Sequence, residues 1–146
     1  MQKLRHLSAP RASSQITLRG QPFTVREVRD RDRALLERLI PSPTPPQRPN
    51  PAKGSLAPHE PDFNDAGYRA SRADCLNQRH AATIAIALNA EDAQDRLWDN
   101  LTKDDERLVW IKDAGDTVGN LTVGEVDRID RILDGFTEST KLLPNV

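Results

Sequence analysis

The side chains best suited to metal or nucleophilic chemistry are few and far apart in this 146-residue chain. Histidine occurs at positions 6, 59 and 80, and the one cysteine is Cys75. None of them has the spacing of zinc ligands, such as C-x2-C or H-x3-5-H. The run His59-Glu60-Pro61-Asp62 gathers ligand types, but its Pro-rich setting offers no scaffold for a coordination site. We therefore expect no metal ion and no cofactor.

Cys75 and His80 are the nearest pair that could act as nucleophile and base. Five positions along a helix turn their side chains about 140° apart, so the pair is not expected to meet. The chain also lacks the motifs G-x-x-x-x-G-K-[ST], G-x-G-x-x-G and G-x-S-x-G, which would indicate phosphate binding or a serine nucleophile. Most carboxylates fall at expected helix starts, where capping explains them. The sequence predicts a buried structural cysteine and no enzyme.

The first element that could position a site is a β-hairpin over residues 15–26. Apolar and polar residues alternate there on either side of a Gly-containing turn, which is the pattern of a half-buried hairpin. The apolar members are Ile16, Leu18, Phe23 and Val25. Two strands are marginal alone, so this face must pack on helices. A short helix over residues 33–40 follows, capped by Asp30 or Asp32 and ended by Pro41.

Residues 41–61 contain eight of the chain's eleven prolines and almost no apolar side chains. Proline removes backbone donors and favours extended, polyproline-like structure. We interpret the segment as a solvated Pro-rich loop inserted between helices. A proline-rich ligand for another protein is the alternative, and Pro43-Thr44-Pro45-Pro46 is too short to decide between them.

Three further helical regions are predicted after a long Ala-rich core helix over residues 64–89. Residues 91–101 form a short helix with acids at its start, and Thr102 opens a capping box for the next helix. The clearest helix begins with the box Thr122-Val123-Gly124-Glu125 and is expected to end at Gly135. Trp98 and Trp110 are expected in the core or half-buried.

The fold class predicted is mainly α with a small N-terminal β-hairpin (α+β), forming a compact helical domain with a Pro-rich loop. The domain spans residues 15–136, with the insertion at 41–61. Residues 1–14 are expected to be a flexible arm, and residues 137–146 a C-terminal tail. Nothing in the chain repeats at a fixed period.

Composition narrows the class of protein further. No stretch approaches the ~20 apolar residues of a membrane span, and no signal peptide pattern follows Met1. A single cysteine indicates a reducing compartment, hence the cytoplasm. Residues 1–53 hold 11 Lys and Arg against 4 Asp and Glu, while residues 54–146 hold 10 against 18. The basic residues are scattered and lack interleaved aromatic residues, so nucleic-acid binding is not favoured.

The order of elements resembles that of tail assembly chaperones of long-tailed bacteriophages and of related prophage or gene-transfer particles. The resemblance lies in the opening pattern I-x-L-x-G-x-x-F-x-V-R-E-V over residues 16–28 and in the closing helix that precedes Gly135. It covers roughly residues 15–136, although the Pro-rich segment is longer than the pattern requires. It is a likeness of pattern and order, without a catalytic signature.

This resemblance implies a non-enzymatic protein that binds the long tape measure protein or another tail protein and shields it in the host cytoplasm. The candidate binding surfaces are the apolar faces of the hairpin and the last helix, although core packing explains the same residues equally well. These residues are Phe23, Val25, Val126, Ile129 and Leu133. The alternative is a structural head–tail or tail-tip component that stays in the virion, and an oligomeric ring would favour it. A homo-oligomer remains open in either case.

Overall fold

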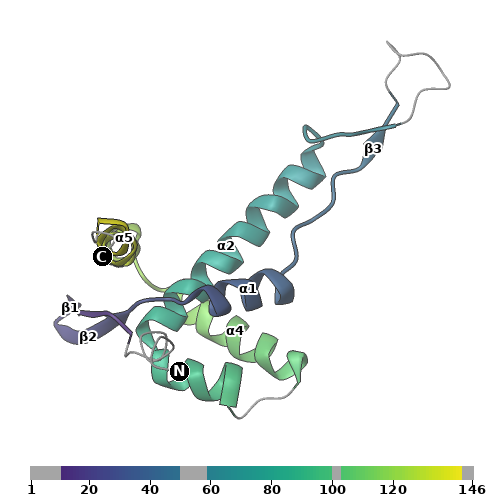
Figure 1. Ribbon diagram of the computed structural model, residues 1–146. Helices are drawn as coiled ribbons and strands as arrows, with labels where there is room; N and C mark the ends of the chain where they lie inside the picture. Colours follow the sequence, from purple (N-terminus) through teal and green to yellow (C-terminus); the bar gives the residue numbers. More distant parts are fainter. Residues whose placement is uncertain (1–10, 50–58, 100–102, 143–146) are drawn as a thin grey trace.

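The chain is mainly helical, with a small antiparallel hairpin in its N-terminal part, as the sequence predicts. The computed structural model describes residues 11–49, 59–99 and 103–142, with side chains through residue 137. The elements are β1 (Ser13–Leu18), β2 (Gln21–Arg26), α1 (Asp30–Leu39), β3 (Gln47–Arg48), β4 (Glu60–Pro61), α2 (Ala66–Leu88), α3 (Ala90–Gln94), the π-helical turn η3 (Asp95–Asp99), α4 (Asp104–Val118) and α5 (Val123–Leu142). α2 is the axis on which the others are arranged (Figure 1).

The hairpin forms as its alternating pattern predicts, beginning two residues earlier than the predicted span of 15–26. Its two-residue turn places Arg19 and Gly20 at φ of 51° and 77°. Positive φ at both positions defines a type I′ turn, whose twist matches that of the strands. In this register Pro22 and the opposing Thr17 direct their backbone groups outward. The missing N–H of Pro22 therefore breaks no bond between the strands.

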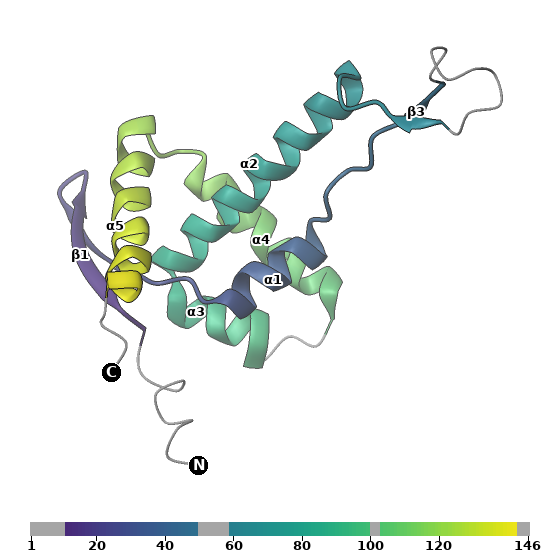
Figure 2. The same cartoon turned by 45° about the horizontal axis from the view of Figure 1, so that its top comes forward.

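The two halves of α2 have different surroundings. In the C-terminal half, Ala82 and residues 84–87 are 0% exposed. The N-terminal half extends away from the other helices beside the extended residues 41–49, and β3 pairs with β4 at the tip (Figures 1 and 2). We call this projection, residues 41–49 and 59–76, the spur, and the remaining helices with the hairpin the body.

Hydrogen bonds to backbone carbonyls hold the spur together at both ends. At its base the Arg79 guanidinium donates to the carbonyl of Ile40 at 2.8 Å. Near its tip the Asp62 N–H donates to the carbonyl of Pro46 at 2.7 Å. The predicted Pro-rich loop stays a prediction for residues 50–58, which lie outside the described residues.

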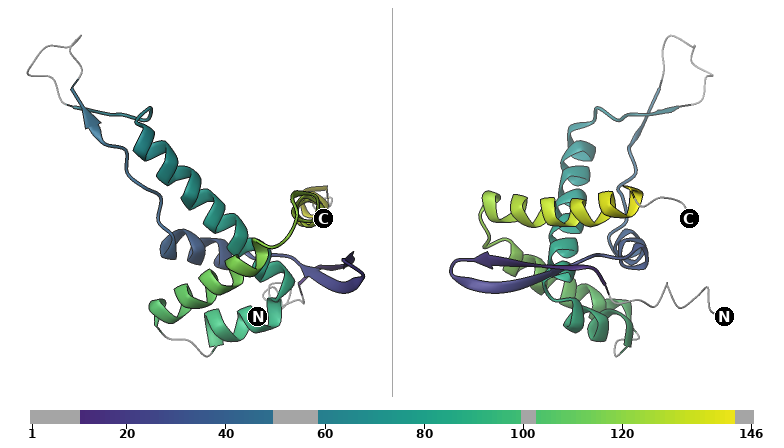
Figure 3. Two further views of the ribbon diagram at one scale, coloured as in Figure 1. Left: turned by 180° about the vertical axis from the view of Figure 1, so that it is seen from behind. Right: turned by 60° about the vertical axis from the view of Figure 1, so that its left-hand side comes forward.

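Two clusters of buried side chains lie on different sides of α2. The first joins α1, α2, α3, η3 and α4, and its most buried members include Leu36, Ile86 and Leu97. The second joins the hairpin, α2, α4 and α5 through Val25, Ile84, Ile129 and their neighbours. α5 runs alongside the hairpin, and α2 crosses both (Figure 3). The second cluster therefore anchors the last helix to the first two strands.

The predicted end of the last helix at Gly135 is wrong, because α5 continues to Leu142. Gly135 has no positive φ, and a Cβ there would meet nothing within 4 Å, so it occupies an ordinary helical position. The predicted boundary at 136–137 thus falls inside α5. The start of α5 is confirmed: the Glu125 N–H donates to Thr122 Oγ1 at 3.1 Å, and Glu125 Oε1 accepts from the Thr122 N–H at 2.9 Å.

Other helix starts differ in detail from their predictions. α1 begins at Asp30 with Arg29 as its N-cap, so neither Asp30 nor Asp32 is the cap. Asp32 instead accepts from the Arg29 N–H at 3.2 Å, from inside the first turn. The predicted helix 91–101 divides into α3 and the π-helical turn η3. Thr102 lies outside the described residues.

Candidate protein-binding groove

Four of the five residues predicted to bind a partner pack together inside the chain. Val25 and Ile129 are 0% exposed and Leu133 is 7% exposed. Val126 is partly buried beside them. The predicted hairpin face and helix face are thus in contact with each other. Phe23 differs, because 39% of it is exposed.

Phe23 lines a groove with a cavity volume of about 540 Å³. The lining comes from the hairpin, the end of α2, the start of α3, the second half of α4 and the segment leading into α5. Its apolar part is Leu18, Phe23, Leu88, Trp110, Ala114, Val118 and Leu121. Its polar part is Arg19, Gln21, Asn89, Asp92, Asp113, Thr117, Asn120 and Glu125. Apolar side chains line the groove, and three carboxylates lie among its polar groups.

Trp110 is the largest side chain in the groove and is held at one edge. Its indole Nε1 donates to Asp92 Oδ2 at 2.6 Å, which joins α4 to α3. The residue is half-buried, as the sequence predicts for both tryptophans. Since the indole N–H already has its acceptor, the ring can offer apolar contact without leaving a polar atom unpaired.

One carboxylate of the groove is fully paired. Arg19, at the hairpin turn, donates to Glu125 Oε1 at 2.9 Å through Nη2 and to Oε2 at 3.2 Å through Nε. These bonds and the backbone N–H of Thr122 lower the pKa of Glu125 to about 2. Glu125 in turn raises the pKa of Arg19, and Arg19 also donates to the Asn120 carbonyl at 2.7 Å. This pair fixes the turn against the start of α5.

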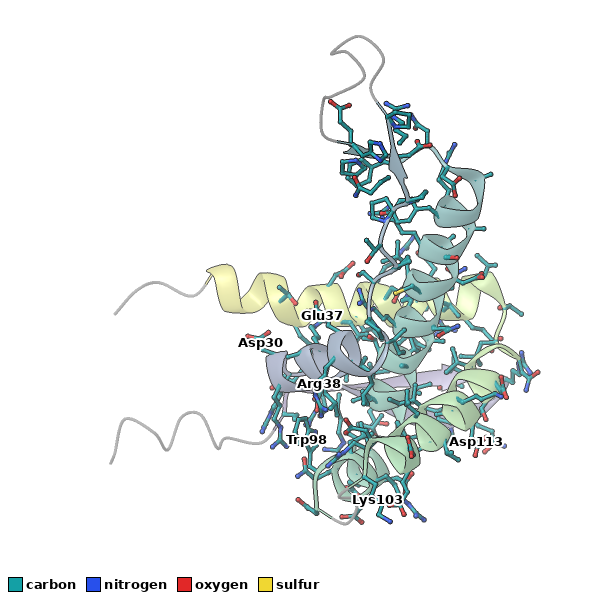
Figure 4. All side chains as sticks on the ribbon, turned by 90° about the vertical axis from the view of Figure 1, so that its right-hand side faces the viewer. Asp30, Glu37, Arg38, Trp98, Lys103 and Asp113 are labelled. Atoms are coloured by element: carbon teal, nitrogen blue, oxygen red, sulfur yellow. The ribbon has the colours of Figure 1, made fainter. Side chains whose placement is uncertain are left out.

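The other two carboxylates leave the groove negative. Asp92 is shared by Trp110 and by Arg96, whose Nε lies 3.7 Å away. Asp113 is exposed, and no partner for its carboxylate is recorded within the described part of the chain. Asp113 lies toward the end of α4 away from Lys103 (Figure 4). Cationic groups of a bound segment would find an acceptor there.

α5, whose Glu125 lines the groove, is tied to the body by polar contacts as well as by apolar packing. His80 Nε2 of α2 lies 2.9 Å from Asp130 Oδ1 of α5. Arg128 of α5 donates to the outward carbonyl of Thr17 at 3.2 Å. Both contacts are exposed, so they orient α5 more than they stabilise it.

A buried carboxylate outside the groove, Asp32, accepts hydrogen bonds from three residues. It is 1% exposed. Its oxygens accept from Arg11 at 2.8 Å, from Trp98 Nε1 at 2.8 Å and from the Arg29 backbone. Trp98 lies just beneath α1, with the guanidinium of Arg31 4.6 Å from its ring centroid (Figure 4). The cluster ties the segment that precedes β1 to α1 and η3.

The histidine and cysteine side chains do not form a reactive centre within the described residues. Cys75 is buried, and its Sγ lies 3.6 Å from the Pro41 carbonyl and away from His80, which pairs with Asp130. Among residues 11–49, 59–99 and 103–142, no group of three or more His, Cys, Asp or Glu side chains could hold a metal ion. In the same residues, no helix is long and apolar enough to cross a membrane.

Comparisons with protein families, curated proteins and solved structures find no match to this chain. The groove is therefore interpreted from its own geometry. Sequence reasoning identified Phe23 but missed Leu88, Asp92, Trp110 and Asp113 as its neighbours. No local pattern marks them, because they come together only when the helices pack.

Proposed function

We propose that this chain is a non-enzymatic protein that binds a helical segment of a partner in the groove. The observation that supports the proposal is the combination of an apolar lining with three carboxylates against a single arginine. An amphipathic helix binds such a surface by placing its apolar residues in the groove and its Lys or Arg residues at the edge. Phe23 and Trp110 would supply the largest apolar contacts, and Asp113 the charge.

The partner that this proposal favours is a long helical structural protein before its assembly. Such a protein exposes apolar stripes until its own partners cover them, and a groove of this kind would shield part of a stripe. The likeness of residues 16–28 and of the element order to tail assembly chaperones makes the phage tape measure protein the proposed partner. The chaperone would act in the host cytoplasm. The alternative, a structural component retained in the virion, uses the same groove for a permanent contact.

Two measurements test the proposal together. A tagged chain is recovered from cells that produce particles, and purified particles are analysed by mass spectrometry in parallel. A chaperone should be recovered with the tape measure protein and be absent from particles. Stoichiometric presence in particles would refute the chaperone role and favour the structural alternative.

A pair of charge variants on α4 tests the groove itself. Asp113→Arg should reduce recovery of the tape measure protein by about tenfold, because it places a cation where the partner's cations bind. Asp116→Arg is the matched control, since Asp116 lies one turn on and lines a different depression, between α2 and α4. Equal recovery with both variants would exclude the groove as the binding surface.

A further inference from the structure

The spur carries a second exposed surface, of the opposite charge. Two large apolar side chains of the spur are exposed, Phe63 at 60% and Leu76 at 48%. Phe63 packs edge-on against Tyr68, with ring centroids 6.1 Å apart. Together with Arg69, Arg72 and Ala73 they line a shallow depression of about 390 Å³. We call these six residues the spur patch.

The spur patch combines one face of α2 with Phe63, which precedes the helix. Positions 69, 72, 73 and 76 follow the i, i+3, i+4, i+7 spacing of one helical stripe. Arg69 and Arg72 are exposed, and no ion pair is recorded for either within the described residues. Asp74 lies on the same helix but about 160° around its axis from Arg72, outside the patch. The N-cap Asp65 accepts from the Tyr68 N–H at 2.9 Å through Oδ2. The patch is therefore apolar and net positive.

The spur patch complements the groove both in its apolar surface and in its charge. The groove has an apolar lining with Phe23 and Trp110 and an excess of carboxylate through Asp92 and Asp113. Arginine is the cation best suited to paired hydrogen bonds with carboxylates at an interface. Apolar groups would then meet apolar groups while Arg69 and Arg72 meet the carboxylates.

Within one molecule the two surfaces cannot meet. Arg72 and the groove residue Leu88 lie on the same continuous helix, so about 24 Å of rigid α2 separates them. The spur also points away from the body in every view (Figures 1 to 3). A second copy is free of this restriction.

We propose that the spur patch of one copy docks in the groove of another copy, so that the chain self-associates head to tail. This inference rests on the proposed function, because it uses the groove that was assigned there to a partner helix. It gives that groove a second occupant, the spur patch of another copy. Each copy keeps a free groove at one end and a free spur at the other, which leads to a closed ring or an open filament. A helical partner would compete with the neighbouring spur for the same groove.

The test reverses one charge on each of the two surfaces and measures self-association by sedimentation velocity over a wide concentration range. The wild-type chain should show a mass that increases with concentration. Arg72→Glu and Asp113→Arg should each weaken self-association by at least about tenfold, because each places like charges in contact. The double variant carrying both exchanges should regain association, since the carboxylate introduced in the spur meets the guanidinium introduced in the groove of the next copy. Arg33→Glu and Asp116→Arg, which lie outside both surfaces, should leave association unchanged.

Three outcomes would overturn the inference: a wild-type chain that is monomeric throughout, single variants that associate like the wild type, or a double variant that stays dissociated. Circular dichroism establishes that each variant is folded. Failure of the inference is separable from failure of the proposed function, because Arg72→Glu leaves the groove intact. That variant should recover at least as much tape measure protein as the wild type, since it removes the competing spur.

Discussion

The two halves of α2 share one backbone and an Ala-rich sequence, yet different forces hold them. In the C-terminal half, Ala82 and residues 84–87 are fully covered by the hairpin and the other helices. In the N-terminal half, residues 69–74 are all exposed, and the helix relies on its propensity, the Asp65 cap and residues 41–49 beside it. Isolated helices of this length are marginal in water. The buried C-terminal half of α2 therefore supports the exposed N-terminal half, which extends from it.

This contrast separates global stability from binding. Substitutions in the buried half should unfold the whole chain, because both apolar clusters contact that half. Substitutions in the exposed half, other than at the buried Cys75, should change only the spur and what it binds. Of the four predictions below, ordered from the largest effect to the smallest, the first and the third test this separation directly.

Ile86→Ala should lower the free energy of unfolding by about 4 kcal/mol, because a fully buried Ile leaves a cavity that the neighbours cannot fill. Leu76→Ala makes a closely related truncation on the same helix and should cost about 0.5 kcal/mol or less, since Leu76 is 48% exposed. Urea unfolding followed by circular dichroism measures both. Similar losses for the two variants would contradict the division of α2.

Asp32→Asn should cost about 3 kcal/mol, because it leaves the largely buried guanidinium of Arg11 without its counter-ion. Asp30→Asn removes an exposed carboxylate from the same first turn of α1 and should cost under about 1 kcal/mol. Both values come from the same urea titration. If the Asp32 variant lost no more than the Asp30 variant, the cluster would be dispensable to the body.

Asp65→Ala should weaken the start of α2 by about 1 kcal/mol, because Asp65 supplies the acceptor for the Tyr68 N–H. The loss should be local. Hydrogen exchange should become faster for amides of residues 68–74, while the amides of residues 82–87 keep their rates. Asp65→Asn retains an acceptor and serves as the control. Faster exchange in both halves would show that the spur and the body unfold together.

Glu125→Gln should change how stability depends on pH. The pKa of Glu125 is about 2 in the folded chain against an ordinary value of 4.5. A depressed pKa contributes stability above 4.5, and that contribution disappears as the pH falls from 4.5 through 2. The difference in unfolding free energy between wild type and variant should thus be constant above about pH 5 and shrink toward about pH 2. A difference that does not change over this interval would contradict the assignment.

Local signals in the sequence predicted the elements well. The alternation around Gly20 and the Thr122 capping box each depend on residues close in the chain, and both are present in the structure. Gly135 failed as a helix end because glycine permits a left-handed residue without requiring one. Leu76 lies in the predicted core helix over residues 64–89, yet it is exposed because no element covers the spur there.

The groove could not be predicted, because its lining is a product of packing. Phe23 was identified from strand alternation, but Trp110 and Asp113 become its neighbours through the placement of α4 against α2 and the hairpin. The same holds for Asp32, which looks like a cap residue in the sequence and is the centre of a buried cluster in the structure. The direction of the spur likewise depends on α2 continuing past the last element that covers it.

The single cysteine allows opening at the base of the spur to be measured with a thiol reagent. Cys75 is 6% exposed, and the carbonyls of Ile40 and Pro41 lie 3.7 Å and 3.6 Å from its Sγ. A thiol reagent can reach it when residues 40–41 separate from α2. The rate of modification therefore measures how often residues 40–41 separate from α2. Comparison with the unfolding rate shows whether this separation occurs while the rest of the chain stays folded. The modification rate of Cys75 is thus a direct measure of how often the base of the spur separates from the body.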